Sequence, residues 1–391
     1  MRFNQYLFED YIPEAIEKVT KLKHLEHAED LMIDSGMHGF HHALEALKKT
    51  NEKLKGKFNT SKVTTKFDGS PSVVFGRHPQ TKKFFVGSKS VFNKEPKINY
   101  TPEDIEKNHG HAPGLVHKLK AALEHLPKIT PKHGIYQGDI MHTKDDVHEH
   151  DGKYHFTPNT IMYSVPKKSE HGKAMEKSHL GIVVHTKYHG DDLENMHAGF
   201  DPDIHNFKKH KDVHLINHET GSVVHSGENE KKFDFHIQQA ETAYNKAHKD
   251  TLPVINAHAA LIKPYINQTV KNDEKPSVEG YRMYLMKRGE KEIASVKTAK
   301  AKQQKHELMM RELHHLEQHP DKFHSMFKIH NHLQHAKNAL VASLAQSSEF
   351  EHSVGKQEVG PEGHVVIHNG HPIKLVNRSE FSKLNFLKNR D

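Results

Sequence analysis

The hydrophobic periodicity of the chain changes twice, and this change restricts the possible folds more than any other feature of the sequence. From Lys62 onward, short apolar runs separated by Gly, Pro and Asn predict strands joined by turns. Over 228–350 the apolar residues instead recur at the spacing of amphipathic helices. Strand and turn patterns return near Glu358. The sequence therefore predicts an α+β protein in which a helical block interrupts a β-rich part.

The same periodicity locates the individual elements. Residues 1–56 read as helical, and a further helix is expected over 114–126. Strands are expected within 63–76, 81–92, 134–141, 159–165, 180–188, 212–217 and 222–226. The predicted organisation is an N-terminal helical cap over 1–59, a first core part over 60–227, a helical insertion over 228–350 and a second core part over 351–391.

Composition excludes several classes of site. The chain of 391 residues has no Cys, which excludes disulfides, iron–sulfur clusters, thiolate zinc sites and a Cys nucleophile, and it suits a reducing compartment such as the cytoplasm. No signal peptide or membrane span is predicted. No P-loop, GxGxxG or GxSxG motif occurs. The formal charge of +7 and the 40 His make a polyanionic partner plausible.

The histidines allow two interpretations. Several have the spacing of metal ligands, but no HExxH pattern accompanies them, and close pairs arise by chance when His is so frequent. The alternative to a structural zinc site is a set of surface histidines that contact phosphates weakly. The residues with this spacing are His148, His150, His315, His319, His330, His332 and His335.

The most informative segment is Lys66-Phe67-Asp68-Gly69, which lies between two predicted strands. One interpretation is a hairpin turn at Asp-Gly with an incidental lysine beside it. The other is a nucleophilic lysine. Because the pKa of lysine in water is about 10.4, such a site must favour the free amine by burial, a neighbouring cation or a metal ion.

Further motifs follow in order, and together with Lys66-Phe67-Asp68-Gly69 they resemble the motifs of the covalent nucleotidyltransferases, the superfamily of ATP-dependent DNA and RNA ligases and capping enzymes. The matching positions are Ser88 and Lys89 for motif Ia, Tyr136-Gln137-Gly138-Asp139 for motif III, Tyr163 for motif IIIa, Glu362-Gly363-His364-Val365 for motif IV and Lys374 for motif V. Asp139 stands where the superfamily has Glu. Val376 replaces a second lysine of motif V, for which Arg378 could substitute.

The resemblance implies a role for each of these residues. Lys66 would attack the α-phosphate of ATP to form a lysyl-AMP, and Lys374 would neutralise charge on the phosphates. Glu362 and Asp139 would hold Mg²⁺, and Tyr163 would stack on the purine. The residues expected to contact the nucleotide are Thr65, Asp68, Gly69, Lys89, Asp139, Tyr163, Glu362 and Lys374.

The resemblance also implies a fold and a function. The expected fold is an adenylation core of two antiparallel sheets, here with the helical insertion. Only 13 residues follow Arg378, too few for the barrel domain that DNA ligases carry there, which favours RNA over DNA as the nucleic-acid partner. The whole is also similar to uncharacterised phage proteins with a Lys-x-Asp-Gly core.

We therefore expect a monomeric, ATP-dependent RNA ligase of the cytoplasm, or of the host cytoplasm if phage-encoded. Two alternatives stay open. One is a DNA ligase whose helical insertion replaces the barrel, and the other is an inert protein that uses this fold to bind nucleic acid or a phage partner.

Overall fold

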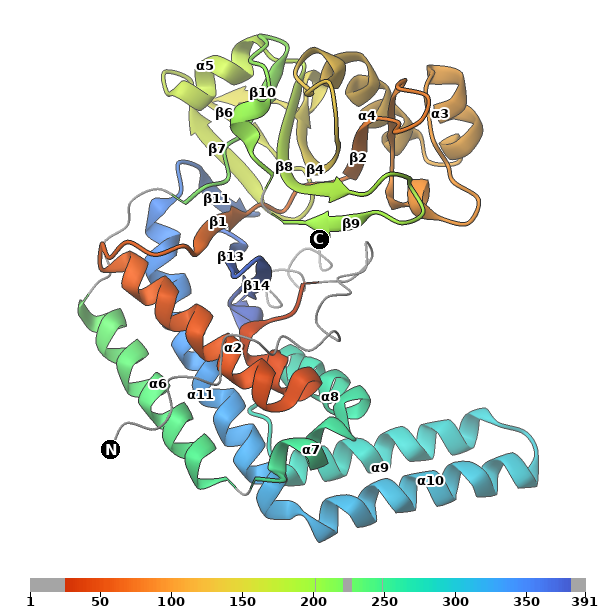
Figure 1. The fold of residues 1–391 in the computed structure, drawn as a ribbon, viewed down its shortest axis with the longest axis vertical. Helices are drawn as coiled ribbons and strands as arrows, with labels where there is room; N and C mark the ends of the chain where they lie inside the picture. Colours follow the sequence, from red (N-terminus) through yellow and green to blue (C-terminus); the bar gives the residue numbers. More distant parts are fainter. Residues whose placement is uncertain (1–24, 201, 221–226, 248, 381–391) are drawn as a thin grey trace. The chain divides into compact units, whose positions relative to one another are not determined.

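The α+β class predicted from the sequence is confirmed by a computed structural model, which describes residues 25–200, 202–220, 227–247 and 249–380 (Figure 1). Of the segment predicted as helical over 1–56, residues 1–24 lie outside these ranges, and the helix α2 (Leu31–Leu54) confirms the prediction within the described part. The predicted strand over 222–226 lies outside the described residues. The described chain forms two units, one of residues 69–159 and 164–217 and one of residues 25–68, 160–163 and 218–380.

The first unit is built on a sheet with the strand order β10-β8-β4-β2-β3, to which β9 adds on β8. All of its pairs are antiparallel except β10 with β8. The strands are β2 (Ser72–Arg77), β3 (Phe84–Gly87), β4 (Ile135–Thr143), β8 (Leu180–His189), β9 (His197–Gly199) and β10 (Val213–Leu215). A short hairpin of β5 (His148–His150) and β6 (Lys153–Phe156) precedes β7 (Met162–Pro166), whose residues are divided between the units.

Helices cover this sheet through their apolar positions. In α4 (Pro113–His125), Val116, Leu119 and Ala122 recur at helical spacing and belong to the same buried cluster as Val73 and Phe75 of β2. The helix predicted over 114–126 is thus confirmed. The other helices of this unit are α3 (Pro102–His109) and α5 (Glu170–Lys177).

The second unit is dominated by helices, as the periodicity over 228–350 predicts. Of these, α6 and α11 pack along each other, while α9 and α10 form an antiparallel hairpin (Figure 1). The helices are α2 (Leu31–Leu54), α6 (Gly227–Lys246), α7 (Thr251–Asn256), α8 (Ala259–Asn272), α9 (Val278–Ser295), α10 (Ala299–Gln318) and α11 (Pro320–Leu344).

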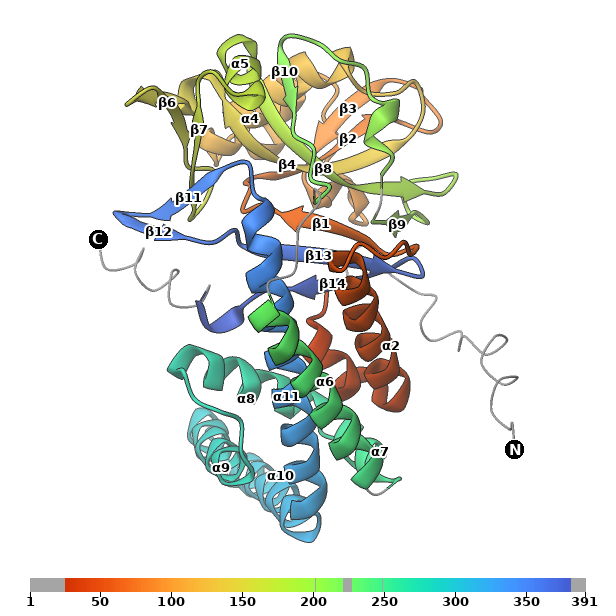
Figure 2. The same cartoon turned by 90° about the vertical axis from the view of Figure 1, so that its left-hand side faces the viewer.

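A three-stranded antiparallel sheet completes the second unit. Its order is β1 (Lys62–Lys66), β13 (Gly363–His368) and β14 (His371–Leu375), which Figure 2 shows side by side. In the register, Val365 of the central strand lies opposite Thr64 on one side and Lys374 on the other. The strands β11 (Glu351–Val354) and β12 (Gln357–Val359) pair as an antiparallel hairpin.

This sheet and the helices share one hydrophobic core. Val63, Val366 and Leu375 on one face of the sheet belong to the same buried cluster as Phe40 of α2 and Leu333 of α11. The helices predicted as an insertion thus pack directly on the β1–β13–β14 sheet. In that cluster, the helices cover the apolar face of the sheet that carries Lys66.

Both edges of this sheet are paired. The Thr65 amide donates to the carbonyl of His218, and the Thr220 amide donates to the carbonyl of Val63 at the edge of β1. On the other side, the Lys374 amide donates to the carbonyl of Glu26, 2.9 Å away. The strands are thus held from both sides. Within the described ranges, no helix has the length and apolar character needed to cross a bilayer.

Candidate functional site

Three residues predicted from separate motifs meet in the second unit. Lys66 ends β1 and lies opposite Gly363, the residue that follows Glu362, while Lys374 lies on β14. The Lys66 Nζ forms an ion pair with Glu362 Oε1. The Lys66 side chain is 28% exposed and that of Glu362 is 9% exposed. The site therefore offers a reachable amine held by a buried carboxylate.

The charges of the three groups act on one another. Burial raises the pKa of Glu362, although the charge of Lys66 opposes that rise. Burial lowers the pKa of Lys374, and the neighbouring charge of Lys66 lowers it further. The charge of Asp68 also acts on Glu362 and that of Glu26 on Lys374, so the site brings two lysines close to several carboxylates.

A small pocket adjoins Glu362. It has a volume of about 260 Å³ and lies between the end of α11, the segment before β13 and the residues after β14. Asn338, Pro361 and Glu380 are among its lining residues. Glu362 Oε2 and Asn338 Oδ1 are buried there and have no hydrogen-bond partner among the described residues. These acceptor oxygens favour a hydrogen-bond donor or a hard cation as ligand.

Asp68, expected to contact the nucleotide, is bound within the protein. Its carboxylate accepts hydrogen bonds from the amides of Thr160 at 2.8 Å and Ile161 at 3.1 Å, and its own amide donates to the Tyr163 hydroxyl at 2.7 Å. The side chain is buried. Asp68 therefore fixes the loop that follows Lys66 to the segment 160–163.

Tyr163 does not lie as the predicted stacking role requires. Its side chain is 1% exposed and packs against Phe67, Phe350 and His352, with ring centroids 5.1–6.1 Å apart. A ring covered in this way has no open face for a purine. The expectation is corrected for this structure: Tyr163 is a core residue that holds Asp68.

One protein-family model matches residues 22–390 of the chain, and its description is a family of unknown function (DUF6267). The chain belongs to this family. No curated protein and no solved structure matches it. Since membership of DUF6267 states no activity, the function has to follow from the residues and their geometry.

The structure of this DUF6267 protein does not support the expectation that Arg378 takes the place of the second lysine of motif V. The Arg378 guanidinium is buried and donates to Asp30 Oδ2 at 2.8 Å, so this group is already neutralised. Val376, at the expected lysine position, is also buried. The motif V role expected of Lys374 stays a prediction, and Arg378 is not placed to share it.

The remaining predicted residues lie in or beside other parts of the fold. Lys89 begins a short 3-10 helix (Lys89–Phe92), and Asp139 lies on β4, where His185 Nε2 is 3.4 Å from its carboxylate. Both belong to the first unit. A Cβ added to Gly69 would lie 2.5 Å from the Asp139 Cβ, so glycine permits this close approach. The joint role of Asp139 and Glu362 as metal ligands stays a prediction.

Sequence reasoning missed a buried charge network in the second unit. Lys337 on α11 pairs with Glu29 at 2.6 Å, and His330 Nε2 lies 2.9 Å from Asp30 Oδ1. The available signal was the position of Lys337 between apolar residues at helical spacing, which places a lysine on the buried face of a helix. The expectation that the histidines lie at the surface is also wrong in part, because His142, His330 and His364 are fully buried.

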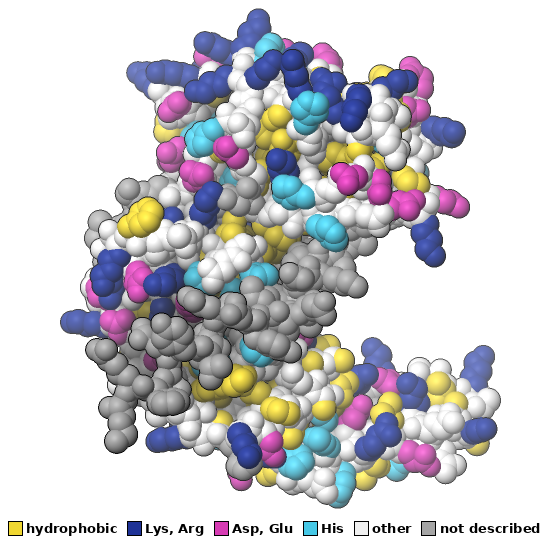
Figure 3. Space-filling model, viewed as in Figure 1, with side chains coloured by type: hydrophobic (Ala, Val, Ile, Leu, Met, Phe, Trp, Pro, Cys, Tyr) yellow, Lys and Arg dark blue, Asp and Glu magenta, His cyan; other side chains and the backbone are white. Residues whose placement is uncertain are grey.

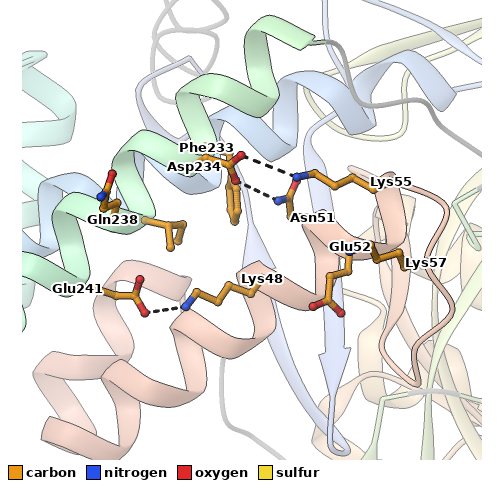
Figure 4. Close-up of a pocket in the computed structure, with 10 residues that line it drawn as sticks. Lys48, Asn51, Glu52, Lys55, Lys57, Phe233, Asp234, Gln238 and Glu241 are labelled. Atoms are coloured by element: carbon orange, nitrogen blue, oxygen red, sulfur yellow. Dashed lines mark hydrogen bonds and ion pairs between the residues drawn. The ribbon is translucent and has the colours of Figure 1, made fainter.

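A groove of about 300 Å³ between α2 and α6 has balanced charges (Figure 4). Lys48 pairs with Glu241 at 2.6 Å, and Lys55 pairs with Glu230 at 2.6 Å. Its lining carries as many acidic as basic side chains, so it offers no excess charge to a polyanion. Among the described residues, no group of three or more His, Asp or Glu is arranged to hold a metal ion.

Proposed function

We propose that this DUF6267 protein is an ATP-dependent polynucleotide ligase, acting on RNA, in which Lys66 is the nucleophile. The observation that carries the proposal is the meeting of Lys66, Glu362 and Lys374 at one end of a small sheet. An incidental lysine beside a hairpin turn would have no reason to pair with the buried carboxylate of another motif and to lie close enough to Lys374 to act on its pKa. Coupling to this buried carboxylate favours the functional interpretation of Lys66.

The proposed reaction has three steps. The deprotonated amine of Lys66 attacks the α-phosphorus of ATP; a nitrogen–phosphorus bond forms, the bond to pyrophosphate breaks and one proton is released to solvent. An oxygen of a 5′-phosphate then attacks the phosphorus of the lysyl-AMP; a phosphorus–oxygen bond forms, the nitrogen–phosphorus bond breaks and the leaving Lys66 amine takes up a proton. Finally a 3′-hydroxyl attacks that phosphate, forms the phosphodiester and releases AMP.

The residues contribute by position and charge. The ion pair with Glu362 fixes the direction of the Lys66 side chain, and this contact must open before the deprotonated amine can attack. Lys374, partly buried beside it, places positive charge where negative charge builds on the departing phosphates. A charge in a water-poor site stabilises a transition state more than it would in bulk water.

Mg²⁺ fits this donor set. Mg²⁺ is usually held by one or two carboxylates together with substrate phosphates, and the unpartnered oxygen Glu362 Oε2 is such a donor. When bound, the ion would neutralise charge on the triphosphate.

The decisive experiment is incubation of the full chain with α-labelled ATP and Mg²⁺, followed by denaturing electrophoresis. We expect a covalent, acid-labile label that is lost in Lys66→Ala and in Lys66→Arg. Lys62→Ala is the matched control, because Lys62 is an exposed lysine of the same strand, and it should label like the parent. Label retained in Lys66→Ala would refute the nucleophile, and no label in the parent would favour an inert binding protein.

A further inference from the structure

The α9–α10 hairpin ends in a segment without acidic residues. Residues 293–306 contain Lys297, Lys300, Lys302 and Lys305 and no Asp or Glu. They form the last turn of α9, the connecting loop and the first two turns of α10. This is a concentrated positive charge in a chain whose formal net charge is only +7.

The outer half of the hairpin takes no part in the core. The buried residues of the two helices are Tyr281 and Leu285 in α9 and Leu313 and Leu316 in α10, all near its base. Further out the two helices contact each other. Gly289 of α9 lies so close to α10 that a Cβ added to it would be 2.3 Å from the Met309 Sδ. The hairpin is therefore a two-helix arm that carries its free end away from the rest of this unit (Figure 1).

Three of the four lysines of this segment form no ion pairs with described residues. Lys297, Lys300 and Lys302 are exposed, whereas Arg288 and Lys305 share Glu292 at 2.9 Å. Figure 3 shows Lys and Arg side chains around the free end of the arm. By contrast, Lys322, near the base of the arm, pairs with Asp250 at 2.6 Å.

We propose that this arm binds the phosphate backbone of a nucleic-acid strand. Three exposed lysines without acidic partners are the side-chain type that neutralises phosphates and releases their counterions, and such binding weakens steeply with salt. The contacts are sequence-independent because lysine acts on phosphate as a point charge. The proposal extends the ligase function by naming the surface that holds the substrate, and it does not require Lys66 to be reactive.

The test compares two triple variants of the full chain. The first is Lys297→Gln/Lys300→Gln/Lys302→Gln. The matched control is Lys208→Gln/Lys209→Gln/Lys211→Gln, which removes the same charge from exposed lysines of the first unit. Fluorescence anisotropy with a labelled single-stranded RNA is measured between 50 and 300 mM NaCl, with self-adenylation as a second readout.

We expect the arm variant to bind at least about 10-fold more weakly at low salt. The magnitude of its slope of log K against log salt should fall by about 2, because each lost phosphate contact removes roughly 0.7. Self-adenylation should be unchanged. The control should bind within about 2-fold of the parent. Both variants should melt like the parent, because the altered side chains are exposed.

Three results would overturn the proposal. Unchanged RNA affinity in the arm variant would remove the binding role, and equal losses in both variants would show that only net charge matters. Competition by polyglutamate as effective as competition by RNA at equal charge would point to an acidic protein partner. Loss of the lysyl-AMP label with intact RNA binding would instead refute the ligase proposal alone.

Discussion

Lys337 and Glu29 form an ion pair with 2.6 Å between Nζ and Oε1, and neither side chain is exposed to solvent. Next to them, Arg378 pairs with Asp30 at 2.8 Å. The segment that carries Glu29 also binds β14, since the carbonyl of Glu26 accepts from the amide of Lys374. The buried network therefore holds α11 and the strand of Lys374 together.

Breaking this network should destabilise the protein strongly. Lys337→Met leaves the Glu29 carboxylate buried without its partner, and we expect the free energy of unfolding to fall by about 3–5 kcal/mol. The double variant Lys337→Met/Glu29→Leu should recover most of that loss. Urea unfolding of the two variants and the parent measures both effects. Equal stability of the single variant and the parent would show that Glu29 is neutralised in another way.

Loss of either partner of Lys66 should slow adenylation without unfolding the chain. Glu362→Gln removes the ion pair and Lys374→Met removes the nearby charge, and each should lower the rate by a factor of about 10² or more. The rate of label formation in single-turnover experiments measures this. Lys356→Met, in the exposed turn between β11 and β12, is the control. Normal rates in both site variants would place the reaction elsewhere.

The buried position of Tyr163 predicts an effect on stability and none on nucleotide binding. Tyr163→Phe keeps the ring but removes the acceptor for the Asp68 amide, so we expect a loss of about 1–3 kcal/mol in the free energy of unfolding. The ATP concentration for half-maximal adenylation should stay within about 2-fold of the parent. Tyr163→Leu should lose more stability because it also disturbs the packing against Phe350. A marked rise in that ATP concentration in Tyr163→Phe would mean that its hydroxyl contacts the nucleotide.

Buried histidines should make the protein sensitive to acid. Burial lowers the pKa of His142 and His352 to about 4 and that of His364 to about 3, whereas the unfolded chain binds these protons near pH 6.5. Below pH 6.5 the unfolded state therefore binds more protons, and stability is lost progressively down to about pH 3–4.

The slope can reach roughly 1.4 kcal/mol per pH unit for each such imidazole. Urea midpoints at pH 7.5, 6.5, 5.5 and 4.5 should be level above pH 7 and fall below it. His364→Leu should reduce the slope, because His364 is fully buried and neither of its ring nitrogens has a partner among the described residues. Constant stability from pH 7 to pH 5 would contradict the prediction.

The helical block, the helix α4 and most strands of the described chain could be predicted, because local periodicity encodes them. The meeting of Lys66 with Glu362 and Lys374 followed from the order of motifs, and no local pattern predicts that contact. Other site details could not be predicted. Whether Tyr163 faces a ligand or the core depends on Phe350, which approaches it only in the folded chain.

The grouping of the sheet with the helices was missed for the same physical reason. The apolar residues of β13 and β14, such as Val366 and Leu375, show that one face is buried, but not which element buries it. Arg378 was assigned to phosphate binding because the sequence gives no sign that Asp30 reaches it.

The pairing of β1 with β13 has a consequence for the synthesis of the protein. Thr64 and Val365 lie opposite each other although they are 301 positions apart in the chain. At about 5–20 residues per second, a ribosome needs roughly 15 to 60 s to make the intervening chain. During that interval β1 leaves the ribosome without its neighbour, and contacts so distant in sequence form slowly. The nascent chain must therefore be kept from pairing β1 with the wrong strand until its C-terminal hairpin emerges.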